Sequence, residues 1–218
     1  MKSFRGVLFD FDGTLVRTME DHLSAWQTVA KEYGIEVDPS QYYLREGSPV
    51  HEIAGIFSGR ELEKTSAEFK EIIRKKEDHF VRNHRFEVYP GVEKFLDELQ
   101  MRGVPAGIVT AGLFDRITRS TPREFLSRFK TLVSGDKVAR GKPFPDSYIM
   151  GASELGLAPE SCIVVENAPL GITAAKQSGA YCVAICSTLE RKHLCEADEI
   201  VDSFADLMSS SAIREVLK

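Results

Sequence analysis

The stretch RGVLFDFDGT, residues 5–14, decides the fold expected for this chain. An apolar run ends there in two aspartates, Asp10 and Asp12, which are separated by one residue. If the run is a strand, side chains two positions apart point the same way, so both carboxylates converge on one small space. Two like charges repel each other in such a space. The pair therefore predicts that a cation, a transferable proton or an electrophile belongs between them.

The composition limits the classes of protein to which the chain can belong. It has 218 residues, of which 43% are hydrophobic, enough for one large domain or for a core with a smaller appended unit. The formal net charge is −5, and Lys and Arg are scattered along the sequence, so we expect no nucleic acid as the main partner. A small charged metabolite suits this balance.

The sequence gives no sign of a membrane protein. No apolar stretch approaches the roughly 20 residues of a membrane span, and aspartate interrupts the first apolar run too early for a secretion signal. We expect a cytoplasmic protein, without a membrane partner, that is a monomer or a weak homodimer. The cysteines lack CxxC spacing, so we expect buried free thiols rather than a metal site or disulfides, with Cys182 and Cys186 on one core strand.

Five further apolar runs follow the first one, separated by segments with helical periodicity: 104–110, 131–135, 161–166, 180–185 and 199–203. This alternation predicts an α/β fold, a doubly wound parallel sheet with helices on both faces. Ligands bind such sheets beyond the carboxyl ends of the strands. Asp10, Thr110 and Glu166 each stand at the carboxyl end of one run, so we expect them to meet.

The segment between the first two predicted strands is far longer than one crossover helix. Helical patterns fill it: EDHLSAWQTVAKEYG, residues 20–34, ends in glycine, and SAEFKEIIRKKEDHFVRN, residues 66–83, begins with a serine cap. We therefore predict an α-helical cap domain of residues 16–86, inserted into a core domain of residues 1–15 and 87–218 that carries the catalytic site.

Four motifs now stand in order: DFDGT at 10–14, IVTAG at 108–112, GKPFPD at 141–146 and VVENAPLG at 164–171. Together they resemble the haloacid dehalogenase-like hydrolases, mostly magnesium-dependent phosphoryl-transfer enzymes with a Rossmann-like core. The resemblance covers essentially the whole chain. The helix after the first motif sharpens it toward the subgroup with a helical cap that includes β-phosphoglucomutase and phosphoglycolate phosphatase.

The resemblance implies a role for each catalytic motif. Asp10 is the expected nucleophile, which forms an aspartyl-phosphate, and Asp12 is expected to protonate the departing alcohol and then to deprotonate the attacking water. Thr110 and the backbone N–H of Ala111, at an expected helix start, offer donors to phosphate oxygens. Lys142 supplies the positive charge that lets a carboxylate approach a phosphate. Gly112 is assigned with Ala111 to substrate binding.

The resemblance also implies Mg²⁺, held by Asp10, the backbone carbonyl of Asp12, Glu166 and Asn167. The family usually has aspartate where this chain has Asn167. Asparagine keeps an oxygen ligand but loses one negative charge, so we expect Mg²⁺ to be retained but bound more weakly. For Glu166 we expect a role through water or a neighbouring ligand rather than direct pairing with Asp10.

The cap offers candidate substrate residues. His22 and Trp26 lie one helical turn apart, on one helix face, and the resemblance to β-phosphoglucomutase implies that His22 assists Asp12. The alternative is a histidine that merely packs beside a core tryptophan. The mutase also uses a lysine in the second cap helix, which points to Lys76 or Lys75, whereas a solvated charged face is expected for at least one of the two.

We predict a Mg²⁺-dependent phosphomonoesterase for a small metabolite, a sugar phosphate or phosphoglycolate. The first alternative is a β-phosphoglucomutase-like phosphomutase, which holds a second phosphate with an arginine of the cap and with serine, lysine and asparagine after the second motif. Here these places are taken by Val50, Gly112, Leu113 and Phe114. Apolar side chains cannot repay the desolvation of a phosphate, although Arg45 or Arg60 could compensate.

Two further alternatives stay open. A 2-haloacid dehalogenase shares the nucleophile but needs neither the second aspartate nor a metal, so Asp12 and Asn167 speak against it. A family member that binds a phosphorylated metabolite without turnover is harder to separate, because Asn167 is a change that lowers the charge at the metal site.

Overall fold

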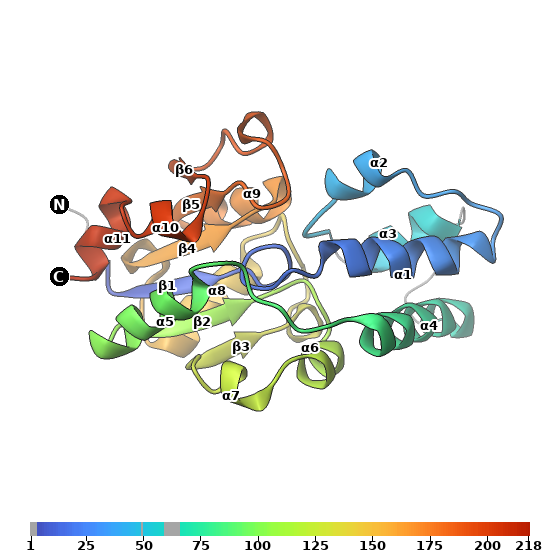
Figure 1. Cartoon of the computed structure of the whole chain (residues 1–218), viewed down its shortest axis with the longest axis horizontal. Helices are drawn as coiled ribbons and strands as arrows, with labels where there is room; N and C mark the ends of the chain where they lie inside the picture. Colours follow the sequence, from blue (N-terminus) through green and yellow to red (C-terminus); the bar gives the residue numbers. More distant parts are fainter. Residues whose placement is uncertain (1–3, 49, 59–65) are drawn as a thin grey trace.

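The protein is described here by a computed structural model that covers residues 4–48, 50–58 and 66–218 (Figure 1). Its centre is a six-stranded parallel sheet with the order β3-β2-β1-β4-β5-β6. The strands are β1 (Gly6–Phe9), β2 (Ala106–Val109), β3 (Thr131–Val133), β4 (Cys162–Glu166), β5 (Tyr181–Ile185) and β6 (Glu199–Val201). The predicted parallel sheet is therefore confirmed, with all six runs as strands. The strand order reverses at β1 and β4, where doubly wound sheets bind their ligands.

Alternation along the strands separates two hydrophobic layers. In β1, Val7 and Phe9 face one side of the sheet and Leu8 faces the other, and all three are fully buried. The first side is covered by α5 (Val92–Met101), α6 (Phe114–Ser120), α7 (Arg123–Leu126), α10 (Phe204–Leu207) and α11 (Ser211–Val216). The second side is covered by α8 (Asp146–Leu155) and α9 (Pro169–Ser178). Helices thus cover both faces, as predicted.

Of the described helices between β1 and β2, the first four form what we call the cap: α1 (Met19–Lys31), α2 (Pro39–Tyr43), α3 (Val50–Ser58) and α4 (Ala67–Asn83). They surround a hydrophobic cluster of their own, in which Trp26, Phe57 and Ile72 are buried. The Ser66 hydroxyl accepts a hydrogen bond of 3.1 Å from the N–H of Phe69, which confirms the predicted serine cap of α4. The predicted domain division after residues 15 and 86 stays a prediction.

The chain leaves and rejoins the core beside β1. Val16 pairs with Val88 in an isolated antiparallel bridge, and the N–H of Tyr89 donates to the carbonyl of Leu15 over 3.1 Å. The two connections therefore lie side by side near the carboxyl end of β1.

The cysteines only partly match the prediction. All four are free thiols; Cys162 and Cys182 are buried, Cys186 is half-buried and Cys195 is exposed. The expectation of buried thiols was wrong for Cys195, which follows the short helical turn Arg191–His193 at the surface. Cys186 lies one residue beyond β5 rather than within it. Among the described residues, no helix has the length and apolar character needed to cross a bilayer.

Candidate active site

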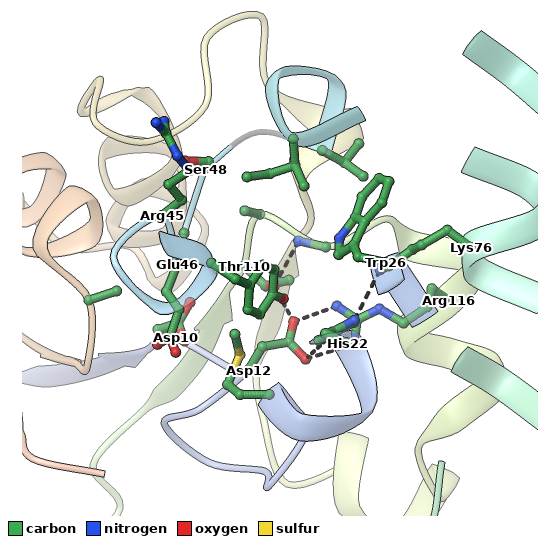
Figure 2. Close-up of a pocket in the computed structure, with 18 of the residues that line it drawn as sticks. Asp10, Asp12, His22, Trp26, Arg45, Glu46, Ser48, Lys76, Thr110 and Arg116 are labelled. Carbon is green, nitrogen blue, oxygen red and sulfur yellow. Dashed lines mark hydrogen bonds and ion pairs between the residues drawn. The ribbon is translucent and has the colours of Figure 1, made fainter. Parts of the chain in front are cut away.

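The candidate site lies at the carboxyl ends of the central strands, under the cap (Figure 2). Asp10 directly follows β1, Thr110 directly follows β2 and Glu166 ends β4. A cavity of about 80 Å³ lies there between core and cap. Core residues Asp10, Asp12, Thr110 and Asn167 line it, together with His22, Trp26 and Lys76 of the cap. The structure thus brings residues of three motifs to one place, and the fourth motif contributes through Lys142.

Lys142 links two carboxylates. Its ammonium lies 2.7 Å from Asp10 Oδ1 and 2.6 Å from Glu166 Oε1, and its side chain is 1% exposed. Burial and the like charge of Glu166 raise the pKa of Asp10 to about 7, while Lys142 opposes the rise. The two carboxylates outweigh the effect of burial on the ammonium, so the pKa of Lys142 is raised. Lys142 therefore stays charged and holds Asp10 at the end of β1.

Glu166 is fixed as the support of Lys142. Its Oε1 also accepts from the Tyr148 hydroxyl at 2.8 Å, and its Oε2 accepts from the N–H groups of Asn167 and Ala168 at 2.9 and 3.1 Å. A Cβ on Gly171 would lie 1.6 Å from Glu166 Oε1, so only glycine leaves room for this carboxylate. Both oxygens thus have protein donors, which favours the indirect role expected for Glu166 over direct binding of a metal.

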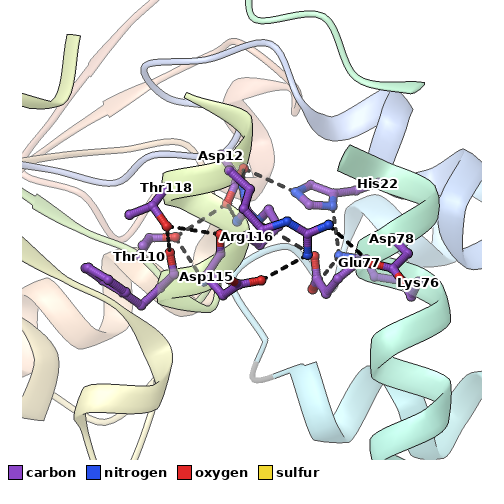
Figure 3. Close-up of polar contacts among 12 residues, drawn as sticks. Asp12, His22, Lys76, Glu77, Asp78, Thr110, Asp115, Arg116 and Thr118 are labelled. Atoms are coloured by element: carbon purple, nitrogen blue, oxygen red, sulfur yellow. Dashed lines mark hydrogen bonds and ion pairs between the residues drawn. The ribbon is translucent and has the colours of Figure 1, made fainter. Parts of the chain in front are cut away.

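Asp12 is held from two sides (Figure 3). One Arg116 nitrogen donates to Asp12 Oδ1 over 2.8 Å, the other donates to Oδ2, and His22 Nε2 lies 3.2 Å from Oδ1. Burial by itself would raise the pKa of Asp12, but Arg116 and His22 outweigh it and hold the pKa well below its usual range. Asp12 is therefore a carboxylate in this arrangement.

His22 connects Asp12 to the cap. The Lys76 ammonium lies 3.0 Å from His22 Nδ1 and 3.1 Å from Glu77 Oε1, and the His22 ring stacks on Phe80 at 4.1 Å between centroids. Burial and the nearby Lys76 charge lower the pKa of His22 to about 4, against the opposing effect of Asp12. His22 is thus neutral at pH 7, and its contact with Asp12 agrees with the predicted orientation.

The other two cap candidates differ in their surroundings. Trp26 is 3% exposed within the cap cluster, and the Lys76 ammonium lies 5.5 Å from its ring centroid. Lys76 is 4% exposed, whereas Lys75 pairs at the surface with Glu32 at 2.5 Å. One lysine of the pair is therefore solvated, as expected, and the other points into the site.

The segment after β2 has a different local structure from the one expected. The N–H of Gly112 donates to Thr110 Oγ1 over 3.0 Å, and the Thr110 hydroxyl donates to Asp12 Oδ2 over 3.4 Å. Helix α6 begins only at Phe114, so the expectation that Ala111 stands at a helix start was wrong. The tight turn at Thr110 delays the helix by using this hydroxyl as an acceptor. Ala111 and Gly112 nevertheless line the cavity.

Asn167 joins the core to the cap. Its Oδ1 accepts from the Thr14 hydroxyl at 3.0 Å, and its Nδ2 donates to Thr188 Oγ1 at 2.8 Å and to Glu46 Oε2 at 2.7 Å. Glu46 lies in the loop between α2 and α3 and is 3% exposed. Burial, together with the charges of nearby Asp10 and Glu166, raises the pKa of Glu46 to about 8.

Comparison with known proteins agrees with this geometry. A family model described as haloacid dehalogenase-like hydrolase matches residues 7–185. The chain belongs to the haloacid dehalogenase-like hydrolases. This finding confirms the family that the four motifs indicated.

Relatives within the haloacid dehalogenase-like hydrolases match over nearly the whole chain. Hexitol phosphatase A of Escherichia coli is 29% identical, over 93% of this chain and 93% of its own length. β-Phosphoglucomutase of Bacillus subtilis is 27% identical, over 93% of this chain and 91% of its own. The crystal structure of CbbY from Rhodobacter sphaeroides in complex with phosphate is 26% identical, covers 94% of this chain and 96% of its own, and has a TM-score of 0.80.

Two charged residues of this haloacid dehalogenase-like hydrolase were missed by the sequence analysis. Arg116 stands two residues after Phe114 and outside every motif, although an arginine at the start of the helix after IVTAG is a signal that could have been used. Glu46 stands in the cap segment REGSP, where a single acid beside Gly47 gives no periodic signal. Both line the cavity, and only the folded chain brings them there.

The residues at the positions where a phosphomutase would hold its second phosphate are mostly apolar. Val50 lines the cavity, Leu113 packs against the cap cluster and Phe114 is 45% exposed. Arg45 also lines the cavity but is exposed at its rim. Arg60, the other arginine considered, lies outside the described residues.

Proposed function

We propose that this chain hydrolyses a phosphate monoester of a small metabolite, a sugar phosphate in the first place, with Mg²⁺ as cofactor and Asp10 as the nucleophile. The observation that carries the proposal is the buried Lys142 ammonium, 2.7 Å from Asp10 Oδ1 at the end of the central strand. Such a pair is what an anionic nucleophile needs in order to approach an anionic phosphate. The E. coli relative named hexitol phosphatase A supports a sugar phosphate as the substrate class.

The first chemical step is transfer of the phosphoryl group to the enzyme. A carboxylate oxygen of Asp10 attacks phosphorus, the bond from phosphorus to the ester oxygen breaks, and Asp12 gives its proton to the leaving oxygen. Before this step Arg116 must part from Asp12, and Asp12 must take up a proton from water, because a carboxylate held by a guanidinium carries no proton. His22, neutral beside Asp12 and backed by Lys76, keeps the carboxyl group in place when Arg116 leaves.

The second step returns the free enzyme. A water molecule attacks the phosphorus of the aspartyl-phosphate, Asp12 accepts the proton of that water, and the bond between Asp10 and phosphorus breaks with release of inorganic phosphate. Lys142 neutralises charge in both steps, and the N–H group of Ala111 and the Thr110 hydroxyl are the donors for phosphate oxygens. Asp12 is thus protonated again at the end of the second step, and it returns to a carboxylate when Arg116 binds it again.

The residues present fit Mg²⁺. Among the described residues, no three His, Cys, Asp or Glu side chains form a ready metal cage. Mg²⁺ does not need one, since it keeps several waters and takes one or two carboxylates besides substrate phosphate. Asp10, the backbone carbonyl of Asp12 and the amide oxygen of Asn167 are the donors that would hold it. The bound ion would supply further positive charge to the phosphate oxygens.

A phosphomutase is the second candidate, favoured by the Bacillus subtilis relative named β-phosphoglucomutase. It requires a site for a second phosphate. Leu113 and Val50 offer no charge or hydrogen-bond donor for that purpose, and the exposed Arg45 is a single cation at the rim. Hydrolysis is therefore the better-supported activity. We also propose a cytoplasmic location, without nucleic-acid or membrane partners.

The proposal is tested by phosphate release from hexitol phosphates, hexose phosphates, phosphoglycolate and nucleotides, with Mg²⁺ titrated and EDTA as control. We expect metal-dependent release that falls by at least about 10³-fold in Asp10→Asn, because the variant lacks the nucleophile. Conversion of β-glucose 1-phosphate to glucose 6-phosphate in the presence of a bisphosphate, without phosphate release, would support the mutase instead. Binding of these esters without either reaction would indicate a binding protein.

A further inference from the structure

We propose that Glu46, carried by the cap, is a ligand residue of the divalent cation beside Asp10 and supplies the negative charge that Asn167 lacks. The inference deepens the proposed function and rests on it for the presence of a cation at this site. Its consequence is that cation binding and the docking of the cap on the core strengthen each other.

Glu46 is a buried carboxylate with half of its hydrogen-bonding capacity unused. Its Oε2 is bound by Asn167 Nδ2 at 2.7 Å and by the Thr188 hydroxyl at 2.8 Å. Its Oε1 has no hydrogen-bond partner among the described residues, although Glu46 is only 3% exposed. A buried carboxyl oxygen without a partner is costly, so its presence indicates a missing ligand.

The unpaired oxygen belongs to a carboxylate that points into the site. Figure 2 shows the Glu46 side chain directed at Asp10, and both residues line the same cavity. A hydrogen-bond donor of the substrate could also use this oxygen, but the charge balance around it favours a cation.

The charges around Asp10 do not balance. Asp10, Glu166 and Glu46 lie together as three carboxylates, and Lys142 is the cation that contacts the first two. Asp12 does not change this balance, because Arg116 neutralises it. When all three are ionised, two negative charges are left over in a buried space, which is the charge that one Mg²⁺ ion would compensate. An aspartate at position 167 would add a third negative charge. With asparagine at 167 and glutamate at 46, the excess charge stays at the value that one divalent ion can compensate.

The loop that carries Glu46 packs directly on the core. Gly47 has φ of +79°, and a Cβ there would lie 3.7 Å from the Gly171 nitrogen. Glu46 then bridges to Asn167 and Thr188, both in the core. If the cap swings away, Glu46 leaves with it, and the cation loses a ligand. By thermodynamic linkage, the cation must favour the docked cap by the same factor.

The test is calorimetric titration of the full chain with Mg²⁺ alone, compared with titration of Glu46→Gln, which keeps the shape but removes the charge. We expect Glu46→Gln to bind Mg²⁺ at least tenfold more weakly. The matched control is Glu36→Gln, at an exposed cap position, which should bind as the wild type does. Adding Asn167→Asp to Glu46→Gln should restore most of the affinity, because the charge returns to the site.

A second readout guards against a variant that fails to fold. The chain has one tryptophan, Trp26, which lines the cavity from the cap. Its fluorescence should change on addition of Mg²⁺ in the wild type and in Asn167→Asp, and not in Glu46→Gln. Equal Mg²⁺ affinity in Glu46→Gln and the wild type would overturn the inference while leaving the phosphatase proposal intact. Tight Mg²⁺ binding that depends on Glu46, without phosphate release from any ester, would support the inference and contradict the phosphatase.

Discussion

At the scale of single residues, the site is a chain of buried charges whose order sets their protonation. Asp12 lies between Arg116 and His22, and Lys76 stands behind His22. Burial of the ring, and then the positive charge of the lysine, lower the pKa of His22, so the imidazole stays neutral although a carboxylate touches it. Arg116, not His22, therefore neutralises Asp12 when no substrate is present.

His22 gives the folded protein a pH-dependent stability. Its pKa is about 4 when folded against 6.5 for a free histidine. Between these values the unfolded chain binds a proton that the folded chain does not, so stability falls as the pH falls from 6.5 toward 4. We expect this loss to reach about 3 kcal/mol, and we expect it to be absent in His22→Gln.

Urea unfolding at pH 7 and at pH 4.5 measures this effect. At pH 7 the wild type should be the more stable protein, and the difference should shrink at pH 4.5. A constant difference between wild type and variant at both pH values would mean that His22 titrates normally in the folded chain.

At the scale of elements, the cap is docked through the contact of α4 with α6. Arg116 and Arg119, one turn apart on α6, meet Glu77 and Asp78 of α4 at 3.9 and 3.2 Å. The first pair is buried, with 2% and 9% of the side chains exposed, and the second is more open, at 43% and 23%. The same helix thus offers a buried and a solvated arginine for comparison.

We expect Arg116→Met to lower the free energy of unfolding by about 3 kcal/mol, because it leaves the half-buried Asp12 carboxylate without its charged partner. Arg119→Met is the matched control, and it should cost less than about 1 kcal/mol, as exposed ion pairs do. Chemical denaturation of both variants at pH 7 gives the two values. Similar small losses in both would show that Asp12 finds another partner or takes up a proton.

Elements were predictable where a local pattern defines them, and contacts between elements were not. The runs around Val7, Ile108 and Val164 are apolar and end in polar residues. The sheet, and the location of the site at the carboxyl ends of its strands, therefore followed from the sequence. The cap loop at Glu46 has no such pattern, and its partner Asn167 lies 121 positions away. Likewise, Arg116 faces Asp12, 104 positions earlier, and its place at the start of the helix after IVTAG is the single local signal for that contact.

At the scale of the whole molecule, the core protects its four cysteine thiols to different degrees. Cys162 and Cys182 are buried in the sheet, and burial raises the pKa of both thiols. Cys186 is half-buried and Cys195 exposed. A thiolate is the reactive form, so reactivity should follow this order of exposure.

We expect a thiol reagent such as dithionitrobenzoate to label one cysteine rapidly in the native protein, to label a second one slowly, and to label all four in urea. Peptide mapping should identify the rapid site as Cys195, and Cys195→Ser should remove that phase without changing the others. Rapid native labelling of Cys162 or Cys182 would contradict the packing of the sheet.

The insertion of the cap between β1 and β2 has a consequence for synthesis on the ribosome. Val7 pairs with Ala106 on one side and with Ile163 on the other, so both neighbours of β1 are made long after it. At roughly 5–20 residues per second, β1 waits on the order of 5 to 20 s for its first partner. The cap helices, whose buried cluster is drawn from residues made before β2, can fold during that time. A translational pause after α4 would therefore hold the nascent chain in its most aggregation-prone state, with a finished helical cap beside an apolar strand that has nothing to pair with.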